Sequence, residues 1–197
     1  MNHSARHLLT ALAIACAATA CSQPPAPPAP PAAPAPPAEP APPPPPPASP
    51  APIIAELAAT EGNSAAGTLT LVAEPAGVRI TGTLSGVAPG GAHGFHVHEK
   101  GDCSAPDASS AGPHFNPGGQ PHGHPGQGPH HAGDMTNLVA NDAGVIVVDE
   151  TVPGVTLGTG GADDILGRAL VLHAKADDYV SQPAGDSGPR IACGVIR

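Results

Sequence analysis

Hydrophobic and polar residues alternate along several short stretches of the chain, starting at Ile53. In residues 65–74 Leu69 and Leu71 alternate with threonines, and residues 77–87 show the same alternation. A period of two places successive side chains on opposite faces of an extended strand. The pattern therefore predicts antiparallel strands with one buried face.

Eight such stretches, separated by turn residues, are expected to be strands: residues 53–60, 65–74, 77–87, 94–98, 136–140, 145–150, 168–174 and 191–197. Residues 99–133 and 175–189 are expected to be long loops. Residues 151–167 are expected to form a further loop, with at most a helical turn near 163–166. The sequence thus predicts an all-β domain, an eight-stranded antiparallel Greek-key β-sandwich or flattened barrel with two long functional loops.

The N-terminal part has a different composition. Residues 1–21 combine a short polar start with an apolar run that ends at Cys21, which is typical of an export signal and resembles a bacterial lipoprotein signal. Cys21 is the candidate lipidation site, with ordinary secretion as the alternative because Ala18 is smaller than the aliphatic residue usual there. Residues 22–52 are almost all proline and alanine, which predicts a disordered, extended linker. We therefore expect the domain, residues 53–197, to be periplasmic and lipid-anchored or, alternatively, secreted and soluble.

Charge and cysteine content narrow the classes of function. The chain has 7 Lys and Arg against 16 Asp and Glu, a net charge of -9, and its basic residues do not cluster. Nucleic acid is therefore not an expected partner. Beyond the leader the cysteines are Cys103 and Cys193, and two distant cysteines without a CxxC motif fit a disulfide better than a thiolate metal site.

Histidine is concentrated in one segment. Residues 93–134 hold eight of the eleven histidines among glycines and prolines, a composition suited to a transition metal. His96 and His98 are one residue apart in a predicted strand, so their side chains point to the same face. His114 and His173 can add two imidazoles, and four imidazoles suit Cu(II) or zinc. If His114 used both ring nitrogens, it would join two ions.

A second set of ligands can be assembled around Asp134. Three nitrogens and one carboxylate make a tetrahedral zinc site. Spacing alone does not choose between His122 and His124, or between His130 and His131, as the partners of Asp134.

Five segments of residues 53–197 closely resemble copper-zinc superoxide dismutases and follow the order of that family: GFHVHEKGDC, SAGPHFNP, HHAGD, GRALVLHAKADD and GPRIACGVI. The resemblance implies the copper ligands His96, His98, His114 and His173. It implies the zinc ligands His114, His122, His131 and Asp134, with His114 as the bridge. It further implies that Asp177 links a copper ligand, His96, to a zinc ligand, His122, and that Cys103 and Cys193 form a disulfide. His93, His124 and His130 fall outside the implied site, and the last two are expected to face solvent.

The resemblance implies an oxidoreductase that dismutates superoxide to oxygen and hydrogen peroxide by alternate reduction and reoxidation of copper. Arg190 is expected to dock the anion beside copper, Lys175 to add attraction, and His114 to take up a proton. The alternative is a non-catalytic periplasmic copper/zinc-binding or copper-delivery protein on the same fold. The complete set of copper nitrogens, together with Arg190, favours the enzyme. A homodimer is compatible with such a domain.

Overall fold

The computed structural model describes residues 52–197. The predicted export signal with Cys21, and the predicted linker except its last residue, lie outside the described residues, so both stay predictions. Within the described range no helix is long and apolar enough to cross a membrane.

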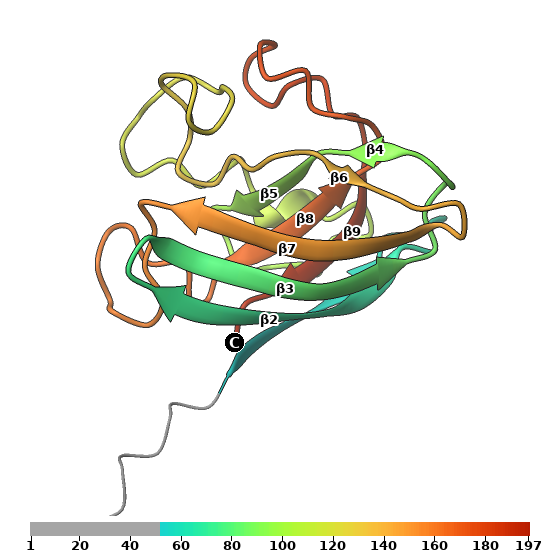
Figure 1. Ribbon diagram of the computed structural model, residues 1–197, viewed down its shortest axis with the longest axis horizontal. Helices are drawn as coiled ribbons and strands as arrows, with labels where there is room; N and C mark the ends of the chain where they lie inside the picture. The colour runs from blue at the N-terminus through green and yellow to red at the C-terminus, as the bar shows by residue number, and fades with distance from the viewer. Residues whose placement is uncertain (1–51) are drawn as a thin grey trace, which may run out of the picture. The chain divides into compact units, whose positions relative to one another are not determined.

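Seven strands form one antiparallel sheet in the order β5-β8-β9-β1-β2-β3-β7, and two short strands, β4 and β6, pair separately. The strands are β1 Ile53–Ala59, β2 Ala66–Glu74, β3 Gly77–Ser85, β4 Ala92–His93, β5 Phe95–His98, β6 Leu138–Val139, β7 Val145–Pro153, β8 Ala169–His173 and β9 Arg190–Val195. The large sheet curls into a half-barrel (Figure 1). The predicted all-β antiparallel fold is confirmed.

Alternating apolar side chains hold β2, β3 and β7 together. Leu69 and Leu71 of β2 and Ile80 of β3 are buried, whereas Thr68 and Arg79, which alternate with them, are exposed. Strand β3 pairs with β2 on one side and with β7 on the other, each over nine residues. Burying a leucine or isoleucine side chain stabilises the fold by about 1.5–3 kcal/mol, so the predicted pattern accounts for this part of the sheet.

Two predicted strand boundaries are wrong. Strand β7 continues to Pro153 instead of ending at Glu150, because its backbone stays paired with β3 as far as Gly77 and Val152 is buried. The predicted strand over 136–140 is reduced to β6, which has only β4 as its partner. In both cases pairing between distant segments, not the local pattern, decides the length of the strand.

The loop after β7 contains a turn organised by a carboxylate. Asp164 is buried, and its carboxylate accepts backbone N–H bonds from Gly158 and Leu166 at 2.9 Å and from Gly160 at 2.6 Å. These bonds close the loop without a helical turn.

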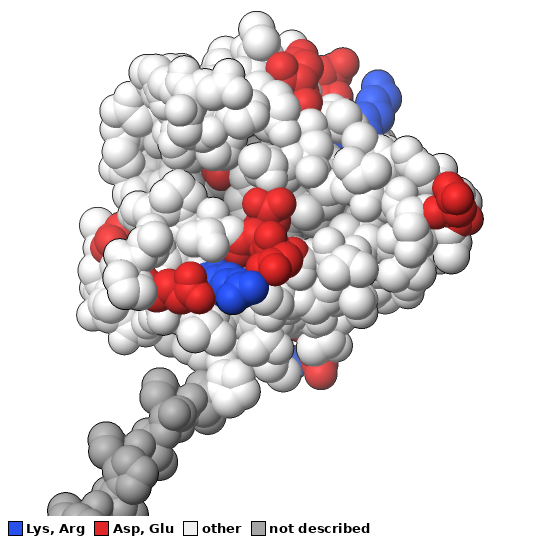
Figure 2. Space-filling model, viewed as in Figure 1, with Lys and Arg blue, Asp and Glu red and all other residues white. Residues whose placement is uncertain are grey.

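The two long loops lie on the same side of the sheet, above β5 and β8 in the view of Figure 1. The first contains a 3-10 helix, η1, over Ser109–Ala111. Between Phe115 and Gly133 this loop has no Lys, Arg, Asp or Glu, and it projects as an uncharged surface in Figure 2. Acidic and basic side chains appear elsewhere on the visible face of Figure 2, over the sheet and at the second long loop. On the sheet, Nε of Arg79 pairs with Oδ1 of Asp149 at 2.9 Å.

Candidate metal centre

Strand β5 is the platform of the site. His96 and His98 lie two positions apart on this extended strand, so their side chains leave the same face, and both are buried. On one side β5 pairs with β8, whose last residue is His173. On the other side β-bridges join His98 to His114 and His96 to Asp134. The platform therefore gathers residues from three separate segments.

Four buried imidazoles form the first group: the candidate ligand atoms lie within 4.8 Å of one another in His96, His98, His114 and His173. Nδ1 of His98 donates to the carbonyl of Gly112 at 2.8 Å, and Nδ1 of His173 donates to the carbonyl of Gly188 at 3.1 Å. Because a carbonyl only accepts, Nε2 of each ring keeps its lone pair, and these two Nε2 atoms are 3.4 Å apart. Facing lone pairs repel each other unless a cation lies between them.

The second group contains a carboxylate, and its candidate ligand atoms also lie within 4.8 Å of one another in His114, His122, His131 and Asp134. Oδ1 of Asp134 is 2.8 Å from Nδ1 of His114 and 3.3 Å from Nδ1 of His131. Oδ2 of Asp134 is 3.0 Å from Nδ1 of His122. His114 belongs to both groups: its Nδ1 faces Asp134, which leaves Nε2 for the first group.

Several buried ring nitrogens of the two groups have no hydrogen-bond partner among the described residues: His96 Nδ1, His114 Nε2, His122 Nδ1 and His131 Nδ1. The last two lie close to Asp134 but are not aligned with it as hydrogen bonds. A buried polar atom without a partner costs about 1–3 kcal/mol. Copper and zinc ions would satisfy all of these nitrogens, so the residues fit two transition-metal ions.

Burial favours the neutral form of three rings in the first group, those of His96, His98 and His173. Desolvation lowers the pKa of His96 to about 4 and the pKa of His173 to about 3, and it lowers the pKa of His98 well below its usual value. A neutral imidazole has a lone pair available for a metal. This group is therefore ready to bind a cation at neutral pH.

The second group has a different charge balance. Burial raises the pKa of Asp134, but its close contacts with His114 and His122 outweigh this effect and bring the pKa below the usual range. Burial lowers the pKa of His122, but the nearby carboxylates of Asp134 and Asp177 outweigh this effect and raise that pKa to about 9. Without metal, a proton on His122 balances part of the negative charge of Asp134 and Asp177, and a divalent cation would replace it.

Asp177 is not part of either group, but it is hydrogen-bonded to one histidine of each. Its Oδ2 accepts from Nε2 of His96 at 2.7 Å, and its Oδ1 accepts from Nε2 of His122 at 2.9 Å. These bonds fix both rings with Nδ1 turned toward the groups. The side chain of Asn137 in turn accepts the N–H of Asp177 and donates to its carbonyl, both at 2.8 Å. Sequence reasoning missed Asn137, because no local pattern signals a contact across 40 residues.

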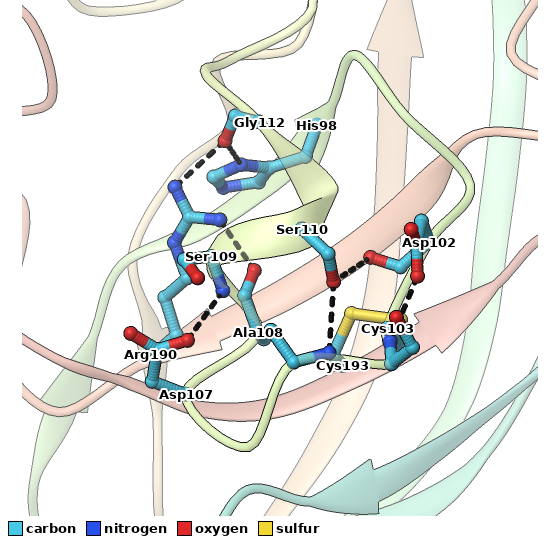
Figure 3. The surroundings of a disulfide bond; sticks show 12 residues. His98, Asp102, Cys103, Asp107, Ala108, Ser109, Ser110, Gly112, Arg190 and Cys193 are labelled. Atoms are coloured by element: carbon cyan, nitrogen blue, oxygen red, sulfur yellow. Dashed lines mark hydrogen bonds between the residues drawn. A yellow bond between two sulfur atoms is a disulfide. The ribbon is translucent and has the colours of Figure 1, made fainter.

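Arg190 begins β9 and lines a cavity of about 740 Å³ together with histidines of the first group. Its Nη1 donates to the carbonyl of Ala108 at 2.6 Å and its Nη2 to the carbonyl of Gly112 at 2.7 Å (Figure 3). The carbonyl of Gly112 also accepts from His98. One backbone group therefore orients both the guanidinium and a ring of the first group.

A disulfide between Cys103 and Cys193 ties the first long loop to β9. Figure 3 shows it beside η1, which is flanked by Ala108 and Gly112, the two residues whose carbonyls hold Arg190. The predicted pair of cysteines is bonded, and the bond fastens the carbonyl acceptors of Arg190 near the strand that carries this arginine.

Comparison with known proteins agrees with this geometry. The sequence model of the family described as copper/zinc superoxide dismutase matches residues 65–196. The chain belongs to this family. It is 44% identical over 146 residues to the Cu-Zn superoxide dismutase 2 of Aquifex aeolicus, covering 73% of this chain and 85% of that protein. It is 39% identical over 123 residues to the superoxide dismutase-like protein YojM of Bacillus subtilis, covering 61% of this chain and 63% of that protein.

The solved structure of a SOD-like protein from Bacillus subtilis matches with a TM-score of 0.67 and 36% identity, covering 73% of this chain and 97% of that chain. The cofactors of a copper/zinc superoxide dismutase are copper and zinc, and the two groups of side chains offer donors that fit both ions.

Three histidines of the described residues lie near the site but outside both groups. Nδ1 of His93 donates to the carbonyl of His173 at 2.8 Å. His124 and His130, predicted to face solvent, are half-buried, and Nδ1 of each ring contacts a neighbouring backbone carbonyl. The ring of His124 also packs 4.4 Å from that of Tyr179, which accounts for its partial burial.

A second guanidinium lines the cavity and was not predicted. Nε of Arg168 donates to the carbonyl of Asp164 at 2.8 Å and Nη1 to the carbonyl of Glu99 at 2.7 Å, and its guanidinium lies 3.8 Å from the ring centre of Phe115. The motif GRALVLH contains this arginine, but the motif does not show which way the side chain turns. Lys175, expected to add attraction, is exposed and does not line the cavity.

Proposed function

We propose that the protein is a superoxide dismutase that converts superoxide to oxygen and hydrogen peroxide. In this proposal the first group would hold copper and the second would hold zinc, and His114 belongs to both groups. The observation that carries the proposal is this shared ring, with Nδ1 beside Asp134 and a buried Nε2 that has no partner among the described residues. A bridging imidazole offers one ring nitrogen to each ion, and in His114 Nδ1 faces the second group while Nε2 faces the first.

Copper, when bound, supplies the one-electron redox chemistry that dismutation requires, which zinc does not. Arg190 provides a fixed positive charge in a protein of net charge -9. Two of its five N–H donors hold the carbonyls of Ala108 and Gly112, so three remain to bind a small anion in the cavity. Nε2 of His114 is the atom that can hold and release a proton beside that anion, while Nδ1 would stay in the zinc group beside Asp134.

Superoxide consumption by the purified protein, loaded with copper and zinc, tests the proposal. We expect fast consumption by the protein that contains both ions and none by the protein that contains zinc alone. Arg190→Met should bind both ions normally and react about tenfold more slowly or worse, because it loses the docking charge, and Arg190→Lys should fall between.

The alternative function predicts a different result. A metal-binding or copper-delivery protein would take up both ions and consume superoxide no faster than the metal-free chain. The name of the Bacillus subtilis relative, superoxide dismutase-like, makes this alternative worth testing. A two-metal protein without activity would reject the proposed enzyme in favour of it.

We also propose that the protein is exported to the periplasm and anchored through a lipid on Cys21. The support is the apolar run before Cys21 and the proline- and alanine-rich segment after it. Cys21→Ser should move the protein from the membrane to the soluble fraction, whereas Cys16→Ser, in the same leader, should leave it on the membrane. If Cys21→Ser stays membrane-bound, the anchor is wrong.

A further inference from the structure

Gln182, in the loop of residues 175–189, binds the backbone of His122 at both of its polar groups. Its Oε1 accepts the N–H of His122 at 2.9 Å, and its Nε2 donates to the carbonyl of His122 at 2.9 Å. In the described part of the chain, these are the hydrogen bonds that this N–H and this carbonyl make. One side chain, 60 residues away in sequence, thus replaces the pairing that a neighbouring strand would give.

The orientation of this carboxamide is defined by its contacts. Nε2 of Gln182 also donates to the carbonyl of Val180 at 3.2 Å. If the amide were turned over, its oxygen would face two carbonyl oxygens and its nitrogen would face an N–H, so only one orientation satisfies the bonds. The contact with His122 is therefore specific to an amide at this position.

The same loop also fixes the far side of the His122 ring. Oδ1 of Asp177 accepts from Nε2 of His122 at 2.9 Å and from the N–H of Tyr179 at 2.6 Å. Gly185 packs against this bond, since a Cβ built on it would overlap Oδ1 of Asp177 and lie 2.8 Å from Nε2 of His122. The loop thus holds both the backbone and the distal ring nitrogen of His122, and Nδ1 remains free.

We propose that Gln182 is a positioning residue for the zinc site. It fixes the backbone of His122 while Asp177 fixes the ring, and together they direct Nδ1 toward Asp134 and His131. The segment around His122 is rich in glycine and proline and has no regular secondary structure, so its own backbone does not supply this constraint. The inference rests on the zinc site proposed above, and it adds a residue that binds no metal and touches no substrate.

Gln182→Met tests the proposal, because methionine keeps the length of the side chain and loses both bonds to His122. The dissociation constant for zinc should rise about tenfold or more. The absorption spectrum of cobalt(II) placed in the zinc site should change, because it reports the geometry of the ligands. Gln127→Met is the matched control, since Gln127 is an exposed glutamine of the histidine-rich loop, and its side chain has no hydrogen bond in the described structure. It should behave like the wild type.

Gln182→Glu separates positioning from charge. It keeps an acceptor for the N–H of His122 but loses the donor to the carbonyl, and it brings a negative charge nearer to zinc. Charge alone would tighten zinc binding, whereas lost positioning weakens it, so we expect weaker binding. If Gln182→Met does not fold, this variant decides the question, and zinc binding as tight as in the wild type together with an unchanged cobalt(II) spectrum overturns the proposal.

The zinc titration of the wild type distinguishes the two levels of inference. A wild type that binds no zinc would reject the proposed zinc site itself. A wild type that binds zinc, with an unchanged affinity and cobalt spectrum in folded Gln182→Met, would overturn only the role of Gln182.

Discussion

The two sides of the large sheet are built differently. Strands β2, β3 and β7 each have nine residues, and β3 pairs along its whole length with both neighbours. Strands β5 and β8 have four and five residues, all of them buried. None of the buried polar residues in the described part of the chain lies on β2, β3 or β7, whereas β5 and β8 contribute His96, His98 and His173.

This contrast shows what each side needs for stability. On the β2–β3–β7 side, the burial of apolar area is sufficient, because every buried side chain there is apolar. On the β5–β8 side, buried imidazoles and carboxylates cost free energy unless they have partners. Those partners come from elsewhere: the ions, the loop with Asp177, and the loop that the disulfide fastens to β9.

Removal of the metals should have the largest effect on stability. This effect should be confined to the β5–β8 side of the sheet and its loops. At free-metal concentrations 1,000 times the dissociation constant, each ion stabilises the folded state by about 4 kcal/mol, so two ions contribute about 8 kcal/mol. Chelation should lower the Tm and speed amide hydrogen exchange in β5 and residues 175–189, while β2, β3 and β7 keep slow exchange. Amide exchange measured by mass spectrometry checks this prediction. An equal loss of protection from exchange on both sides of the sheet would contradict it.

Loss of the disulfide should have the next largest effect. The bond joins residues 90 positions apart, and the chain-entropy account gives it about 4 kcal/mol. Cys103→Ser combined with Cys193→Ser should also slow superoxide consumption. Without the disulfide, the loop that contains η1 would no longer be fastened to β9, and its carbonyls would orient Arg190 less firmly. Denaturant unfolding and the reaction rate measure the two effects.

Ser110→Ala is the matched control for the disulfide variant. Its hydroxyl donates to the carbonyl of Asp102 at 2.8 Å and accepts the N–H of Ala105 at 3.0 Å, which ties together the same loop (Figure 3). Its loss should cost about 1 kcal/mol and leave the rate unchanged. An equal loss of rate in both variants would show that the disulfide has no particular role in holding Arg190.

A core substitution on the β2–β3–β7 side, the apolar side of the sheet, should have a smaller effect on stability. This effect should be independent of metal binding. Ile80→Ala removes a fully buried side chain from β3 and should lower the free energy of unfolding by about 3 kcal/mol. Val147→Ala, on β7 with 72% of the residue exposed, should change it by less than about 0.5 kcal/mol. Zinc and copper affinities should be unchanged in both variants. A metal affinity that falls with Ile80→Ala would show that the two sides are coupled.

The alternation and spacing of residues along the chain were sufficient to predict the strands of the apolar side and part of the metal site. The alternation in β2 and β3 predicted their buried faces, and the single residue between His96 and His98 predicted a shared face. The local pattern did not predict that β7 extends to Pro153 through its pairing with β3, or that β4 forms with only two residues. These features depend on partners that are distant in sequence.

The other residues of the site were identified from the family resemblance, or they were not predicted at all. Spacing did not choose among four loop histidines. The structure places His122 and His131 beside Asp134, while the Nδ1 atoms of His124 and His130 contact backbone carbonyls. The contacts of Asn137 and Gln182 span 40 and 60 residues, and an amide in a loop gives no sequence signal of such a contact.

The smallest predicted effect is the pH dependence of the metal-free protein, which reports on the polar side directly. The pKa of His122 is raised from 6.5 to about 9 in the folded state, so its contribution to stability is fully present below about pH 6.5 and is lost as pH rises through 9. Burial lowers the pKa of His96 to about 4 and that of His173 to about 3. The unfolded state therefore takes up these protons first, and stability falls as pH drops below 6.5.

The metal-free protein should thus be most stable near pH 6.5, with a loss of at most about 3 kcal/mol on the alkaline side. The metal-loaded protein should lack this alkaline loss, because bound zinc takes the place of the proton on His122. His122→Gln in the metal-free protein should flatten the alkaline side and leave the acid side intact, as measured by urea unfolding across a pH series. If the wild-type midpoint stays constant between pH 6.5 and 9, His122 is not paired as a cation with Asp134 and Asp177, and the polar side is held without that charge.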